Sequence, residues 1–170
     1  MNHFRYLAIS CLFISLYPSL LFGSQSTLEI KIKAAYLYNF TKFVDWPDQK
    51  GKDPQICIVG DSALSSVLEE LAAKQRSGTS FIVVSDSKIN PSECQILYIS
   101  NMARDMTNVL NSSKEQNILT VSDDERFSER GGMVTLFSEN GKIRFEMNMP
   151  AIRKTNLQIS SKLLELAKKR

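Results

Sequence analysis

The chain has 170 residues, of which 43% are hydrophobic and 23% are charged, and its formal net charge is +3. This size and composition are typical of one soluble globular domain with its own core. Because the charge is small and the two signs are evenly mixed, the composition argues against a nucleic-acid partner.

The first 23 residues follow the pattern of a secretory signal peptide. Arg5 stands in a short leading region, an apolar run extends from Leu7 to Phe22, and small or polar residues follow. The run is shorter than the ~20 residues that span a bilayer comfortably. We therefore expect cleavage between Gly23 and Thr27, a single mature domain over residues 24–170, and no transmembrane segment after cleavage. An uncleaved membrane anchor is the alternative.

Apolar residues recur at helical spacing from Ser26 to Trp46, and Pro47 ends the pattern because proline cannot continue a helix. This predicted helix is rich in aromatic residues, namely Tyr36, Tyr38, Phe40, Phe43 and Trp46. We interpret the rings as packing against a sheet. A stacking surface for bases or sugars is the alternative.

A strand over Gln55–Gly60, a turn at Gly60-Asp61-Ser62 and a helix over Ala63–Arg76 form a predicted βα unit. Phosphates often bind where such a strand meets a helix N-terminus. A single glycine falls short of the glycine-rich pattern of nucleotide-binding turns, so phosphate binding is the minor interpretation here.

Three more strands are predicted over Ser80–Ser85, Gln95–Ser100 and Ile118–Ser122, with a helix over Asn101–Leu110 between the last two. The first two strands are nearly continuous apolar runs, which is typical of strands buried on both faces of a parallel sheet. The acidic loop that follows, 123–125, does not have the spacing of a calcium loop.

Asn140-Gly141 predicts a β-hairpin, because a two-residue type I′ turn needs positive φ at both central positions. The resulting register pairs Glu139 with Lys142, Phe137 with Arg144, Leu136 with Phe145, Thr135 with Glu146 and Val134 with Met147. Alternation predicts an apolar inner face with Val134, Leu136, Ile143, Phe145 and Met147, and an available outer face with Thr135, Phe137, Lys142, Arg144 and Glu146. The predicted fold class is therefore α/β: one domain, a mainly parallel sheet flanked by helices, and a C-terminal antiparallel hairpin.

Two short helices are expected after the hairpin. Asn148 is a predicted N-cap before Pro150, and Ser160 or Ser161 caps a final helix that extends to Lys169. Its inward residues are expected to be Leu163, Leu164, Leu166 and Ala167.

The outer face of the hairpin and the chain that follows it are the predicted partner-binding site. Its residues are Phe137, Arg144, Glu146, Asn148 and Ile152. An aromatic ring, an arginine and a polar rim are typical of interfaces. The site would extend to Asn39 and Lys42 of the first helix. A solvated sheet face with an ordinary charge pair is the alternative.

The residues exclude several kinds of chemistry. His3, the only histidine, lies in the predicted signal peptide, so the mature chain has no histidine base and lacks the commonest transition-metal ligand. We expect no catalytic residue, no metal and no cofactor. Hydrolysis catalysed by the carboxylates Asp61, Asp123, Asp124 or Glu146 is the enzymatic alternative. Binding of a small nucleotide or other solute is another alternative.

Cys57 and Cys94 allow one disulfide; two buried thiols are the alternative.

The motif KAAYLYNFTKFVDWP at 33–47 and the later motifs GGM, KIRFEMN and LQISSKLLELA, with CIVGD and CQILYIS between them, resemble the YfiR family of periplasmic regulatory proteins. The resemblance covers nearly all of the chain after residue 27. It implies a periplasmic repressor that docks on the periplasmic region of an inner-membrane diguanylate cyclase or sensor kinase. It also implies an outer-membrane lipoprotein as a second partner; a homodimer is a further alternative.

The same resemblance favours the disulfide between Cys57 and Cys94. The first and third predicted strands would be neighbours in the sheet, which brings the two Cα atoms within the ~4.4 to 6.8 Å that a disulfide allows.

Overall fold

The computed structural model describes residues 22–47, 51, 53–74, 81–85, 89–113 and 116–168. Residues 1–21, which make up most of the predicted signal peptide, lie outside the described residues. The helices of the described part lack the combination of length and apolar character that crossing a bilayer requires.

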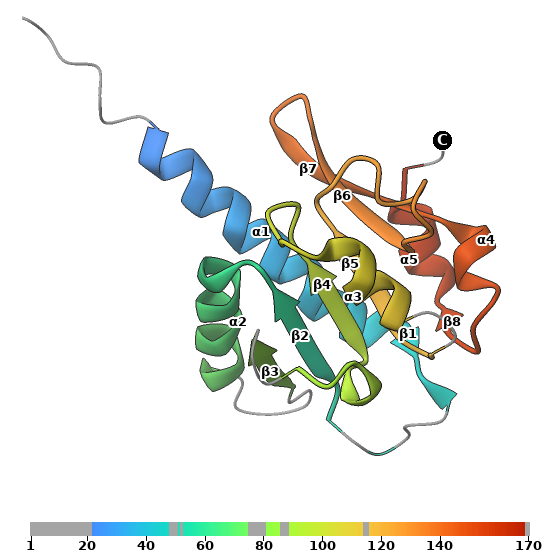
Figure 1. The fold of residues 1–170 in the computed structure, drawn as a ribbon. Helices are drawn as coiled ribbons and strands as arrows, with labels where there is room; N and C mark the ends of the chain where they lie inside the picture. The colour runs from blue at the N-terminus through green and yellow to red at the C-terminus, as the bar shows by residue number, and fades with distance from the viewer. Residues whose placement is uncertain are drawn as a thin grey trace, which may run out of the picture.

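A six-stranded sheet with the order β3-β2-β4-β5-β6-β7 forms the centre of the domain (Figure 1). The pairs from β3 to β6 are parallel, and β6 and β7 form an antiparallel hairpin. The strands are β2 (Gln55–Val59), β3 (Ile82–Ser85), β4 (Ile96–Ile99), β5 (Leu119–Ser122), β6 (Val134–Glu139) and β7 (Lys142–Met147). The predicted fold class is confirmed.

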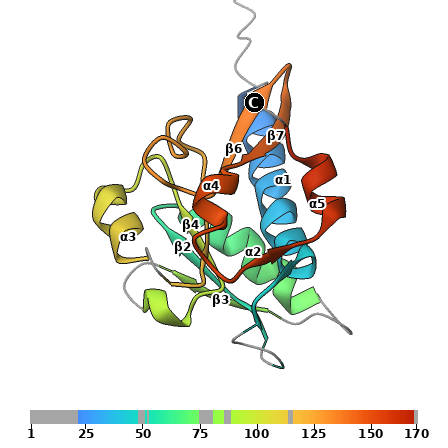
Figure 2. The ribbon, with the colours of Figure 1, turned by 90° about the vertical axis from the view of Figure 1, so that its right-hand side faces the viewer.

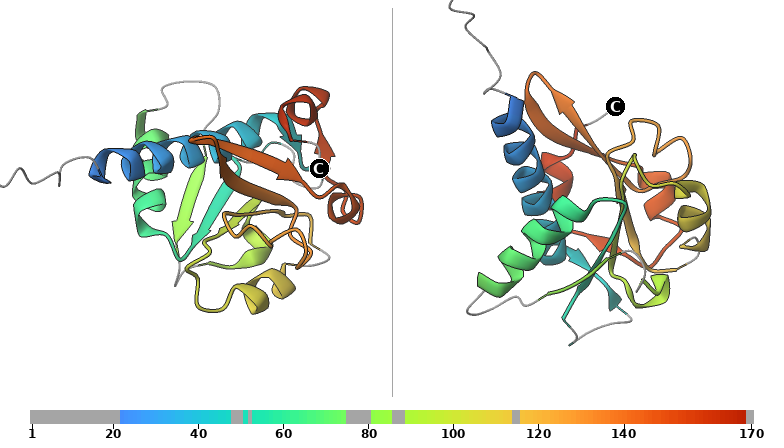
Figure 3. Two further views of the ribbon diagram at one scale, coloured as in Figure 1. Left: turned by 90° about the horizontal axis from the view of Figure 1, so that it is seen from above. Right: turned by 60° about the vertical axis from the view of Figure 1, so that its left-hand side comes forward.

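Helices cover both faces of this sheet. One face carries α1 (Phe22–Phe43), α2 (Ser62–Lys74) and α5 (Ser161–Leu166), and the opposite face carries α3 (Met106–Ser112) (Figures 2 and 3). A short 3-10 helix, η3 (Pro91–Glu93), precedes β4, and α4 (Met149–Ile152) follows β7. The layers are helix, sheet, helix, as the sequence predicts for a parallel sheet.

A second, two-stranded antiparallel sheet joins β1 (Val44–Asp45) to β8 (Gln158–Ile159). It ties the end of α1 to the segment before α5. The sequence did not predict it, because two residues are too few to show a strand period.

Alternate residues of the central strands enter two separate cores. Ile56 and Ile58 of β2 pack under α1 and α2, whereas Cys57 packs on the α3 side. In β4, Tyr98 packs in the core under α1 and α2, and Leu97 packs in the core on the α3 side. Strands buried on both faces are mostly apolar on both faces, which is why β2 and β4 are nearly continuous apolar runs in the sequence.

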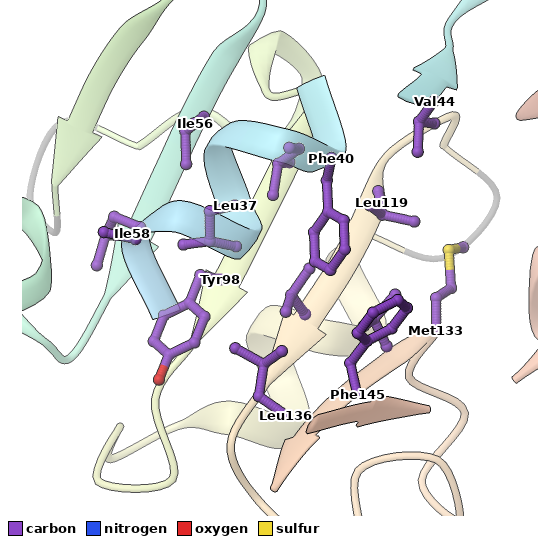
Figure 4. Packing of buried hydrophobic residues seen from close by; sticks show 14 of the residues in the cluster. Leu37, Phe40, Val44, Ile56, Ile58, Tyr98, Leu119, Met133, Leu136 and Phe145 are labelled. Carbon is purple, nitrogen blue, oxygen red and sulfur yellow. The ribbon is translucent and has the colours of Figure 1, made fainter. Parts of the chain in front are cut away.

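The aromatic residues of α1 fill the larger core. Leu37 and Phe40 are buried and point at the strands, with Phe40 beside Phe145 of β7 (Figure 4). The Phe40 and Phe145 rings meet edge to face, with centroids 5.4 Å apart. The Tyr38 ring packs on Phe81 at 5.5 Å. The interpretation that these rings pack against a sheet is confirmed.

The burial of one strand and the boundaries of two helices differ from the prediction. Strand β3 is an edge strand and leaves Ile82 51% exposed, so it is not buried on both faces. Helix α3 begins at Met106 instead of residue 101, because the main chain at Asn101 donates to Asp123 and turns before the helix begins. Helix α5 ends at Leu166, and the side chain of Leu166 is 68% exposed instead of facing inward.

A disulfide joins Cys57 of β2 to Cys94, which lies between η3 and β4. Their Cα atoms are 5.9 Å apart, and both side chains are buried in the core on the α3 side. Strands β2 and β4 are parallel neighbours, as the prediction required.

Replacing Cys57 and Cys94 together with alanine should lower the free energy of unfolding. The bond closes a loop with a sequence separation of 37 residues, so the chain-entropy contribution is about 4 kcal/mol. Denaturant unfolding of oxidised wild type and of the double variant measures the difference. Reductant should destabilise the wild type and leave the variant unchanged; two free thiols in unfolded, unreduced wild type would contradict the bond.

Candidate functional site

The β6–β7 hairpin has the predicted register. All five predicted pairs, from Val134 with Met147 to Glu139 with Lys142, are present. Asn140 and Gly141 have φ values of 51° and 71°, the left-handed region that a type I′ turn uses.

The outer face of this hairpin is available only near the turn. Arg144 is exposed and Phe137 is half-buried, as a docking surface requires. Toward the base of the hairpin, however, Thr135 is buried and Glu146 is only 5% exposed. The prediction that the whole outer face is available is therefore wrong at this end, because two other segments cover it.

The first covering segment is the loop that precedes β6. The hydroxyls of Ser128 and Thr135 hydrogen-bond each other at 3.0 Å, and the Ser128 hydroxyl donates to Glu146 Oε1 at 3.3 Å. The second covering segment follows α5, where Lys168 forms a parallel bridge with Glu146. Glu146 is thus a buried carboxylate in a polar network instead of a surface charge.

Asn148 lies at the end of β7 with its side chain used inside the protein. Its Oδ1 accepts from the main chain of Ala151 at 3.2 Å and caps α4. Its Nδ2 donates to the carbonyls of Ser128 and Gly132, both at 3.0 Å. The predicted cap is confirmed, but Asn148 positions the loop before β6 and does not present a free amide.

Ile152 is 2% exposed and belongs to the main core. The prediction that it contributes an exposed aliphatic side chain is wrong. Helix α4 has only four residues, and its residues Met149 and Ala151 also pack against this core, so the helix directs its last residue inward.

A groove of about 820 Å³ lies beside Glu146, between the base of the hairpin, α4 and the end of α5. We call it the hairpin groove. Its lining combines apolar side chains with charged ones and consists of Ser128, Glu129, Glu146, Met147, Asn148, Met149, Pro150, Arg153, Leu164, Ala167 and Lys168. Two predicted site residues, Glu146 and Asn148, therefore line it, whereas Phe137, Arg144 and Ile152 do not.

Sequence reasoning missed the contributions of Ser128, Arg153, Leu164 and Lys168 to this groove. The spacing of Leu164 indicated a core position, and the basic end of the chain indicated a helix terminus. No local pattern shows that segments so far apart in the sequence meet beside β7.

The proposed extension of the site to Asn39 and Lys42 stays a prediction for Asn39, whereas the contacts of Lys42 direct it toward the opposite edge of the sheet. Both are exposed, but the Lys42 ammonium lies 3.9 Å from the centroid of the Tyr38 ring. Tyr38 packs on Phe81, next to β3. Because β3 and β7 are opposite edges of the sheet, Lys42 lies away from the hairpin.

The carboxyl ends of the central strands, where phosphate binding was the minor interpretation, hold carboxylates in internal contacts. Asp61 Oδ1 accepts from the main chain of Leu64 at 2.9 Å and caps α2. Gly60 has a φ of 79°, and a Cβ there would lie 3.0 Å from Ala103, so the glycine serves a tight turn. A negative charge at the helix N-terminus opposes phosphate binding.

Lys33 of α1 joins this cluster through Asp123 Oδ2 at 2.8 Å and Glu29 Oε1 at 2.9 Å. Burial by itself lowers the pKa of Lys33, but the hydrogen bonds to Asp123 and Glu29 outweigh it and hold the pKa above its usual value. Burial, with Asp123 and Asp61 nearby, raises the pKa of Tyr98. The cluster attaches α1 to the sheet. Across the described residues, no three acidic, cysteine or histidine side chains are arranged to hold a metal ion.

Asn148→Ala should destabilise the protein by about 2 to 4 kcal/mol, because it removes a helix cap and leaves two carbonyls without their donor. Asn148→Asp retains the cap but places a carboxylate against the same carbonyls, so its stability should recover partly as acid protonates the new side chain. Urea unfolding measures both, with the exposed Asn156→Ala as control. A loss below ~0.5 kcal/mol for Asn148→Ala would contradict this role.

Comparison with known proteins agrees with the resemblance seen in the sequence. A family described as YfiR/HmsC-like matches residues 30–168. This span contains all the described strands, the disulfide and the hairpin groove. The chain belongs to the YfiR/HmsC-like family, which is a family of periplasmic regulators.

Proposed function

We propose that this protein is an exported, non-enzymatic regulator that binds a membrane-bound signalling enzyme in the periplasm and inhibits it. The proposed partner is a diguanylate cyclase. Membership of the YfiR/HmsC-like family supports the regulatory role. The hairpin surface, which consists of the exposed turn end of β6–β7 and the adjoining hairpin groove, is the proposed contact.

The observation that carries the proposal is the combination of side chains on the hairpin surface. Exposed Arg144 and half-buried Phe137 are opposite each other on the two strands. The Lys168 ammonium lies 5.6 Å from the centroid of the Phe137 ring. Beside them the groove offers apolar walls with the buried Glu146 carboxylate at the base. Aromatic and arginine anchors around a partly apolar depression are typical of protein interfaces.

Three of the four carboxylates that would serve a hydrolase have structural roles, and the fourth, Glu146, lines the groove. Asp61 caps α2, Asp123 bonds Lys33, and Asp124 forms an ion pair with Arg130 at 2.8 Å. A general acid and base must face a common substrate space. These three contacts instead direct the carboxylates to groups of the same protein chain, away from a common substrate space. This supports a binding function.

Reversing the charge at Arg144 tests the contact. Arg144→Glu should leave the free energy of unfolding within about 0.5 kcal/mol, because the side chain is exposed. It should raise cyclic di-GMP and biofilm in cells at equal protein abundance, because repression is lost. Arg104→Glu, the same change at an exposed position next to α3, is the control and should repress normally. Normal repression by Arg144→Glu would exclude this surface.

A photo-crosslinking residue placed at position 144 identifies what the surface touches. A cyclase adduct supports the proposal in full. A sensor kinase, an outer-membrane lipoprotein or a second copy of the chain as the sole adduct would contradict the cyclase assignment.

The groove also favours a second candidate function, the sensing of a small solute. Its volume of about 820 Å³ is in the range that small-molecule sites occupy. A solute at 100 times its Kd should stabilise the fold by about 2.7 kcal/mol. Thermal unfolding with a panel of nucleotides and amino acids measures this effect. Leu164→Trp, which fills the groove, should abolish the shift, and Leu166→Trp, on the exposed side of the same helix, should retain it. No shift with any compound would argue against solute sensing.

A further inference from the structure

The C-terminal segment Ala167–Lys168 leaves the helix and runs beside β7. Helix α5 ends at Leu166, and Ala167 is extended, with φ −69° and ψ 138°. The main-chain N–H of Lys168 donates to the carbonyl of Phe145 at 2.9 Å, and Lys168 forms a parallel bridge with Glu146. The residues Leu164 to Lys168 alone would favour continued helix, so this departure is imposed by the pairing. We call Ala167–Lys168 the strap.

The strap covers an edge that would otherwise be open. β7 is the last strand of the sheet, and its outer side carries main-chain groups that β6 does not reach. The Tyr36 hydroxyl donates to the carbonyl of Ile143 at 3.0 Å, and the strap supplies the next contact, at Phe145. An open strand edge readily pairs with another chain.

The strap pairs weakly with β7, although Ala167 packs against the main core and the Lys168 ammonium lies 5.6 Å from the centroid of the Phe137 ring. Its Lys168 ammonium forms an ion pair with Glu139 that lowers the pKa of this carboxyl, but both side chains are well exposed to water. Exposed ion pairs contribute little to stability. Residue 168 is the single strap residue in a bridge with β7, whereas β6 and β7 share six pairs. A segment joined to a sheet by one bridge opens at a lower free energy than a strand held by six pairs, and it can do so without global unfolding.

We propose that the strap occupies the place of a partner strand: an extended segment of the protein partner displaces it, pairs with β7 at Phe145–Met147 and closes the hairpin groove. The inference rests on the proposed partner-binding function. The strap indicates the chemistry of that segment. Ala167 lines the groove beside Met147 and Leu164, so a larger aliphatic side chain there would fill it. The next residue carries a positive charge that matches Glu139.

Amide hydrogen exchange of the wild-type protein tests whether the strap opens by itself. The Lys168 amide should exchange at least ~100-fold faster, relative to its intrinsic rate, than the amides of the β6–β7 pairs, because local opening exposes it. Equal protection would show that the strap opens only with the fold and would overturn the proposal.

Peptide binding tests whether the edge of β7, once the strap is removed, pairs with an added strand. The probe is an acetylated, fluorescent peptide with residues 164–170 of this chain, added to the full chain and to a chain that ends at Leu166. The shortened chain should bind it at least about tenfold more tightly, because the full chain carries a tethered competitor. The same peptide with proline at the position of Lys168 lacks the N–H donor and should not bind. Equal binding by both chains, or binding that proline does not weaken, would overturn the proposal.

A repression assay in cells distinguishes a failure of this inference from a failure of the proposed function. The chain that ends at Leu166 should repress more strongly than wild type at equal abundance. If it represses like wild type while Arg144→Glu fails to repress, the strap proposal is wrong and the proposed function stands. If Arg144→Glu also represses normally, the proposed contact itself is wrong.

Discussion

The packing of α1 against β7 is the contact on which the candidate site depends. The Phe40 and Tyr36 rings meet Phe145 at centroid distances of 5.4 and 5.3 Å, and the Tyr36 hydroxyl holds the carbonyl of Ile143. A hairpin has little stability in water by itself. Held against a 22-residue helix, β7 becomes a fixed edge, and the base of that edge places Glu146 and Asn148 at the hairpin groove.

The hairpin register could be predicted because its cause is local. Asn140-Gly141 sets a two-residue turn, and the period of two then assigns every pair and both faces. The apolar face was predicted correctly, with Val134, Leu136 and Phe145 in the core. Only one disulfide was possible, since Cys57 and Cys94 are the only cysteines outside the predicted signal peptide, and the resemblance to the family favoured this bond over two buried thiols.

The burial of Glu146 and Ile152 could not be predicted, because its cause is not local. An alternating pattern places Glu146 opposite the core, and that much is correct. Ser128 and Lys168 then cover it, although they lie 18 and 22 positions away in the sequence. No periodicity within β7 carries information about those segments. The same reason explains why the helix period of residues 163–167 predicted a longer α5 than the structure has.

Segments from three parts of the chain meet at the hairpin groove, and they differ in how firmly they are held. The loop at Ser128 is tied by Asn148, and β7 is tied by α1 and β6. The third segment, after α5, pairs with β7 through residue 168. A molecule that binds in the groove therefore meets two walls that several contacts attach to the core and one wall that pairs with β7 at a single residue. A ligand shifts a conformational equilibrium by its difference in affinity for the two conformations, so the wall that is paired at a single residue needs the smallest such difference to be displaced.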